Sequence, residues 1–81
     1  MPTNKIVLYY IEKITLEDAR IICNKNNWDF SDNEIIFILN FARQYKEYLN
    51  KESKDFLLYR FKQVTNENTY NKVLSIVNQF I

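Results

Sequence analysis

Five carboxylates lie beside two predicted helix starts and are the side chains best placed for general acid–base chemistry. Asp29, Asp32 and Glu34 surround one start, and Glu17 and Asp18 surround the other. Groups that transfer protons need pKa values matched to the working pH. Acidic side chains at these same positions also cap helices and offset the helix dipole. We therefore interpret all five as structural, and we predict no catalytic residue and no enzyme activity.

The residue types that the chain lacks exclude several kinds of site. The 81 residues include no histidine, no glycine and a single cysteine, Cys23. Without histidine, Ser-His-Asp triads, Cys-His dyads and most zinc sites cannot form. Without glycine there is no Gly-rich phosphate loop and no compact calcium loop. We interpret Cys23 as a small hydrophobic side chain of the core, and we predict no metal, no cofactor and no small-molecule substrate.

Basic residues alternate with tyrosines in the second half of the chain. This pattern is one way of binding single-stranded nucleic acid, through phosphate contacts and base stacking. The basic residues are Arg43, Lys46, Lys51, Lys54, Arg60 and Lys62. Acidic residues lie among them and the net charge is only +1, so a mixed solvated face explains the pattern better. Nucleic-acid binding is therefore our alternative hypothesis and not the favoured one.

Residues 31–49 carry the strongest helix signal. Ser31 and Glu34 have the spacing of a capping box, and Phe30 and Ile35 have that of a hydrophobic staple. An apolar stripe with the 3.6-residue period follows. We predict that this segment is the central helix of the fold.

A second apolar stripe runs along the same helix. It consists of Phe37, Phe41 and Tyr48. A helix that is apolar on two faces is typical of the buried centre of a fold. The alternative is that the second stripe meets another chain, so we predict these three residues as candidate protein contacts.

Four shorter segments complete the predicted fold. The apolar spacing predicts helices over 4–13, 15–25, 53–64 and 65–81. Thr3, Thr15, Ser53, and Thr65 or an asparagine just after it are the expected caps, and an asparagine is expected to take the left-handed position that ends 15–25. Residues 4–13 also have strand propensity, but a lone strand would have no partner. We predict an all-α fold, a compact bundle of four or five short helices.

The bulk properties indicate one domain over residues 1–81. The longest apolar run, Ile6–Ile11, has six residues, whereas a membrane-spanning helix needs about 20. A signal peptide would need a longer apolar stretch followed by small residues. Together with the single cysteine, these features predict a cytoplasmic protein with no membrane partner.

The order of these motifs resembles a known family. Ile14-Thr15-Leu16-Glu17-Asp18-Ala19 precedes an Asn-rich turn, Phe30-Ser31-Asp32-Asn33-Glu34-Ile35 follows it, and Val64-Thr65-Asn66-Glu67 leads into a last helix that ends Asn78-Gln79-Phe80-Ile81. This order is similar to that of the small YqfT-like proteins of Bacillus and related low-GC Gram-positive bacteria, a family of unknown function. Leu16 stands where many members have proline. The resemblance implies a cytoplasmic, helical bacterial protein, and it supplies no catalytic or binding residues.

The aromatic content of 16% is high for so short a chain. A small core filled by large side chains predicts such a content, and so does a surface that binds protein. Our leading hypothesis is a non-enzymatic module that binds another protein or itself, including as a homodimer.

Overall fold

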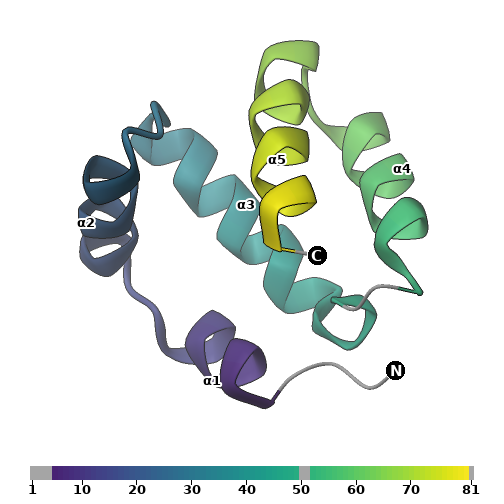
Figure 1. The fold of residues 1–81 in the computed structure, drawn as a ribbon, viewed down its shortest axis with the longest axis horizontal. Helices are drawn as coiled ribbons and strands as arrows, with labels where there is room; N and C mark the ends of the chain where they lie inside the picture. The colour runs from purple at the N-terminus through teal and green to yellow at the C-terminus, as the bar shows by residue number, and fades with distance from the viewer. Residues whose placement is uncertain (1–4, 50–51, 81) are drawn as a thin grey trace.

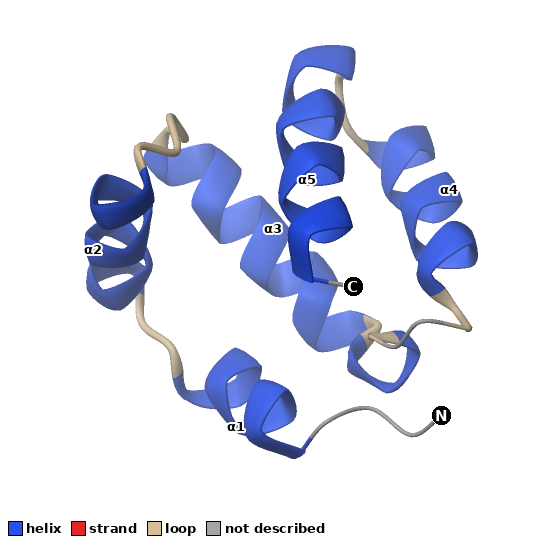
Figure 2. Cartoon of the chain, in the orientation of Figure 1, coloured by secondary structure: helices blue, strands red, loops and turns tan. Residues whose placement is uncertain are grey.

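All five predicted helices are present in the computed structural model, which describes residues 5–49 and 52–80. The helices are α1 (Lys5–Lys13), α2 (Leu16–Asn26), α3 (Asp32–Gln44), α4 (Lys54–Val64) and α5 (Glu67–Phe80), with a short 3-10 turn, η1, at Lys46–Tyr48. Within the described ranges there is no strand, as Figure 2 shows. The all-α prediction is confirmed, and residues 5–13 are helical.

Two capping boxes begin α2 and α3. The hydroxyl of Thr15 accepts from the Asp18 amide at 3.1 Å, and that of Ser31 accepts from the Glu34 amide at 3.1 Å. Each acid returns the contact, because its carboxylate accepts the backbone amide of the capping residue. Four amide groups that would otherwise lack partners at helix starts are satisfied in this way.

Asparagines end one helix and cap the start of another, as predicted. Asn27 ends α2 with φ at 58° and ψ at 35°, the left-handed conformation that glycine usually supplies. The side chain of Asn66 accepts from the Thr69 amide at 2.8 Å and so caps α5. Ser53 precedes α4 but makes no capping hydrogen bond, and the predicted cap Thr3 lies outside the described residues.

The central helix is shorter than predicted. It ends at Gln44 and not near Leu49, and the chain continues as η1. The Tyr48 amide donates to Tyr45 and the Leu49 amide donates to Lys46. These contacts span three residues instead of four, and such bonding tightens the chain at the end of a helix. The tighter turn lets the Tyr48 ring reach Phe56 of α4, with the centroids 5.4 Å apart.

Helix α3 is the element around which the others are arranged. Figure 1 shows it running behind α5, with α2 near its beginning, α1 beneath its second half and α4 on the other side. It packs against α1 and α2, while α4 packs against α5. The radius of gyration is 12.0 Å, close to the roughly 12 Å expected for a folded chain of this length.

The buried core is small. Among the described residues, the buried apolar side chains are Ala19, Ile35, Leu57, Leu58 and Phe61. Two apolar hollows adjoin it, one of about 240 Å³ between α2, α3 and α5 and one of about 120 Å³ between α3, α4 and α5. Ile38, Val73 and Val77 line both hollows. The five helices therefore close only part of their apolar surface against one another.

Candidate protein-binding face

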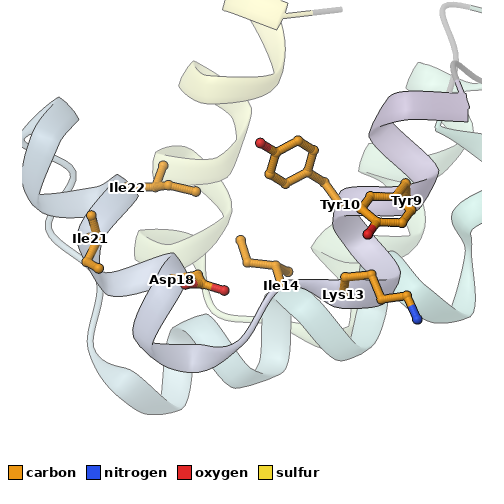
Figure 3. A pocket seen from close by; sticks show the side chains of 7 residues that line it. All are labelled: Tyr9, Tyr10, Lys13, Ile14, Asp18, Ile21 and Ile22. Carbon is orange, nitrogen blue, oxygen red and sulfur yellow. The ribbon is translucent and has the colours of Figure 1, made fainter.

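A hollow of about 390 Å³ opens between α1 and α2. Figure 3 shows the side chains that line it, which are Tyr9, Tyr10, Lys13, Ile14, Asp18, Ile21 and Ile22. We call this surface the α1–α2 face. The Tyr10 ring extends from α1 toward Ile22 on α2, and Ile14 lies at the link between the two helices. Tyr10, Ile14 and Ile22 therefore form an apolar floor. The two charged lining residues, Lys13 and Asp18, lie near the link between the helices.

Large apolar side chains on this face remain exposed. Tyr9 is 65% exposed, Tyr10 is 59% exposed and Ile21 is 52% exposed. A scattered apolar residue on a surface needs no explanation, but a continuous patch is a mark of a contact surface. Here three such side chains border one hollow, so the α1–α2 face is the leading candidate for an interaction site.

Helix α1 is held in place by polar contacts from the end of α3. The Arg43 guanidinium donates to the backbone oxygen of Ile11 at 2.8 Å and to that of Ile14 at 2.7 Å. These oxygens belong to the last turn of α1 and the residue after it, where helix carbonyls lack partners. Lys46 adds an ion pair with Glu12 at 2.5 Å, which lowers the pKa of Glu12 and raises that of Lys46. These anchors leave the tyrosine side of α1 uncovered.

Helix α2 is tied to the start of α3 by an exposed charge cluster. The Arg20 Nε donates to Asp32 at 2.9 Å, and the same guanidinium pairs with Glu17 at 3.1 Å. The hydrogen bond from Arg20 lowers the pKa of Asp32, while the two carboxylates raise that of Arg20. This exposed cluster links α2 to the first residue of α3, and Ile21 on α2 is 52% exposed.

The predicted contact residues Phe37, Phe41 and Tyr48 face another helix of the same chain. Phe37 and Phe41 lie against Phe61 of α4, with centroid distances of 5.8 and 5.0 Å. Phe37 and Tyr48 keep 37% and 44% of their surface exposed, whereas Phe41 is half-buried. The second stripe thus packs on α4, and its role in binding another protein stays a prediction.

The predicted basic residues are spread over the fold. Arg43 and Lys46 bind α1, as described above. Lys54 lines the apolar hollow beside α4, and Arg60 donates to Gln63 at 3.0 Å. Lys62 lies 5.5 Å from the ring centroid of Tyr70, and Lys51 lies outside the described residues. The structure does not bring the five described cations to one site, and nucleic-acid binding stays a prediction.

The carboxylates of Glu17, Asp18, Asp32 and Glu34 have partners inside the chain, and Asp29 accepts from Lys72 at 2.6 Å through its backbone oxygen. Glu34 accepts from the Thr69 hydroxyl at 2.5 Å and from Lys72 at 3.2 Å. Thr69 is only 2% exposed. The Thr69 hydroxyl, the Ser31 amide and Lys72 together lower the pKa of Glu34 to about 2. Asp32 is turned toward Arg20 instead, so these two carboxylates serve different contacts.

The interpretation of Cys23 as a core residue fits its position. It is half-buried and lines the larger apolar hollow with Trp28 and Phe30. Burial raises the pKa of its thiol, which favours the unreactive protonated form. Across residues 5–49 and 52–80, no three His, Cys, Asp or Glu side chains are grouped so that they would hold a metal ion.

The sequence contained one signal for the α1–α2 face. Ile6–Ile11 is apolar at every position, and a helix that is apolar all round cannot turn every side toward one small core. Some of this run had to be left over once α1 packed against α3. Of the residues in this run whose side chains the structure describes, Tyr9 and Tyr10 remain exposed and Ile11 is half-buried.

Comparison with protein-family models, curated proteins and solved structures finds no significant match to this chain. The resemblance to the YqfT-like proteins therefore stays a prediction. Of the helices in the described ranges, none combines the length and the apolarity that crossing a membrane requires.

Proposed function

We propose that this chain is a non-enzymatic protein-binding module and that the α1–α2 face is its binding surface. The observation that carries the proposal is the grouping of Tyr9, Tyr10 and Ile21, each more than half exposed, around one apolar hollow. Tyrosine is enriched at protein interfaces because its ring buries a large area while its hydroxyl stays hydrogen-bonded. The hollow offers a seat for an apolar side chain of a partner.

The state of the carboxylates supports a non-enzymatic role. A general acid or base that works near neutral pH needs a carboxyl pKa raised toward that pH. Glu12, Asp32 and Glu34 instead have lowered pKa values, because each is bound by a cation or a hydroxyl. Each carboxylate links two segments of the fold, so its chemistry is used for structure.

The half-buried Cys23 supports a cytoplasmic location as part of the same proposal. A single cysteine cannot form a disulfide within the chain, and proteins of oxidising compartments that have so small a core are often rich in disulfides. In a reducing compartment such as the cytoplasm, the thiol of Cys23 stays reduced.

The proposal is tested by changing the face without changing the fold. A Tyr10→Ser, Ile21→Ser double variant removes two exposed anchors, and Tyr59→Ser is the matched control, since Tyr59 is 61% exposed on α4. We expect the double variant to lose self-association in sedimentation experiments, or to lose capture of a protein retained by the wild-type chain. The control is expected to keep the wild-type behaviour.

Two results would overturn the proposal. One is a double variant that binds as the wild type does in both measurements. The other is a Tyr59→Ser control that loses binding to the same extent. Circular dichroism spectra identify any variant that has failed to fold.

A further inference from the structure

We propose that the partner of the α1–α2 face is a second copy of this chain, bound through an interface with two-fold symmetry. This inference rests on the proposed function and names its partner. In such a dimer the same patch is used by both copies, so it must be complementary to itself. An apolar floor meets this requirement directly, because Tyr10 and Ile21 of one copy would cover the equivalent floor of the other.

The charges on the face are also complementary to themselves. Lys13 and Asp18 are the two charged residues that line the hollow, and Figure 3 shows them on opposite sides of Ile14. A two-fold axis that passes close to Ile14 exchanges these two sides. Each Lys13 then meets the partner's Asp18, and the dimer gains two ion pairs, each between a lysine and an aspartate.

Both groups are available for such pairs. Lys13 is exposed and forms no ion pair with any described residue. Asp18 is exposed and uses its Oδ2 to accept the Thr15 amide at 3.3 Å. A carboxylate has about four acceptor positions, so the capping contact leaves room for a lysine.

Other features favour a second copy over a strongly charged partner. The face carries one cation and one anion, so it offers no net charge for an acidic or a basic surface to recognise. The whole chain has a net charge of +1, so two copies repel each other weakly. Among the residues whose burial the structure describes, few apolar side chains are buried, and a small domain is stabilised when it assembles.

The test reverses each charge separately and then mixes the two variants. In Lys13→Glu every contact across the axis pairs two acids, and in Asp18→Lys every contact pairs two lysines. Each variant alone is expected to raise the dimer Kd about tenfold or more, measured by sedimentation equilibrium. In an equimolar mixture both contacts of the heterodimer pair opposite charges, so we expect association to return to near the wild-type Kd.

A second series keeps the test valid if Asp18→Lys unfolds, since that substitution also removes the capping carboxylate of α2. Lys13→Gln deletes the two ion pairs and Lys13→Glu adds repulsion. The dimer Kd is therefore expected to rise from the wild type to Lys13→Gln and again to Lys13→Glu. Lys25→Glu is the matched control, because Lys25 is exposed on α2 and does not line the hollow.

The outcomes separate this inference from the proposed function. A wild-type chain that remains monomeric up to about 1 mM, or a mixture that associates no better than its components, would overturn the two-fold dimer. A monomer that nevertheless captures another protein through Tyr10 and Ile21 would overturn the dimer alone. A wild-type chain that neither self-associates nor captures another protein would overturn the two proposals together.

Discussion

The interior around Phe61 and Thr69, on the α3–α4–α5 side of the molecule, and the α1–α2 face place aromatic and polar side chains in different surroundings. On the first side, Phe61 is 3% exposed against Phe37 and Phe41, and Thr69 is 2% exposed against Glu34. On the α1–α2 face, Tyr9 and Tyr10 are more than half exposed. Phe61 is thus covered by other rings of the chain, while Tyr9 and Tyr10 stay exposed. Phe56 and Tyr59 on α4 are exposed as well, at 47% and 61%.

The contrast shows where the chain has satisfied its own side chains and where it has not. Around Glu34, a buried hydroxyl, a backbone amide and a lysine all converge on one carboxylate. Around Ile14, one lysine and one aspartate flank an apolar hollow without pairing with each other. Apolar surface that the chain does not cover with its own side chains is typical of a protein-binding site.

The largest expected effect lies on the closed side. Phe61→Ala removes the ring that contacts both Phe37 and Phe41, and we expect it to lower the free energy of unfolding by about 3–5 kcal/mol. Phe56→Ala is the matched control, because Phe56 is 47% exposed on the same helix, and we expect a loss of about 1 kcal/mol or less. Urea unfolding followed by circular dichroism measures both. Equal losses would show that α4 is not closed against α3 as described.

A smaller effect is expected at Glu34 and depends on pH. In the unfolded chain its carboxylate binds a proton below about its ordinary pKa of 4.5, but in the folded chain only below about 2. Between these values the unfolded state binds more protons, so stability is fully present above pH 4.5 and is lost as the pH falls toward 2. We expect this group to contribute about 2–3 kcal/mol of that loss.

Two variants check the origin of the pH effect. Glu34→Gln keeps a capping side chain but has no charge to titrate, so its urea midpoint should fall less between pH 6 and pH 3 than that of the wild type. Thr69→Val removes the hydroxyl that contributes most to the lowered pKa and should reduce the effect in part. Unchanged pH dependence in both variants would contradict the contact between α3 and α5.

The smallest effect on stability is expected on the α1–α2 face. Tyr10→Ser removes a ring that is 59% exposed, so the free energy of unfolding should change by about 0.5 kcal/mol or less under conditions in which the chain is monomeric. At higher concentrations the wild type should gain stability that the variant does not gain, since association stabilises the folded state. A large loss in the dilute monomer would place Tyr10 in the core instead.

The local parts of this fold could be predicted from the sequence because the interacting residues are neighbours. The pairs Ser31–Glu34 and Thr15–Asp18 lie three residues apart, and Asn27 acts within its own turn. The end of α3 could not be predicted in this way. It depends on the contacts of η1, which lead Tyr48 to α4, and an apolar stripe that continues past Gln44 gives no sign of them.

The candidate site depends on contacts between distant residues. Arg43, which anchors α1, is 32 positions from Ile11, and no spacing rule predicts this contact. The sequence identifies Phe37, Phe41 and Tyr48 as an apolar stripe, but it does not decide between packing inside the fold and contact with another chain. In the structure the stripe packs on α4. The apolar run Ile6–Ile11 led us to predict a helix with no assigned contact surface, and its place beside α2 required the fold.

The most direct test of the central claim follows the amide signals of the wild-type chain in nuclear magnetic resonance spectra during dilution. If the α1–α2 face is the contact surface, the concentration-dependent shifts will gather at Tyr9, Tyr10, Ile14 and Ile21, and the signals of α4 will stay constant. Shifts confined to Phe37, Tyr48 and their neighbours, or shifts absent from α1 and α2, would contradict the account.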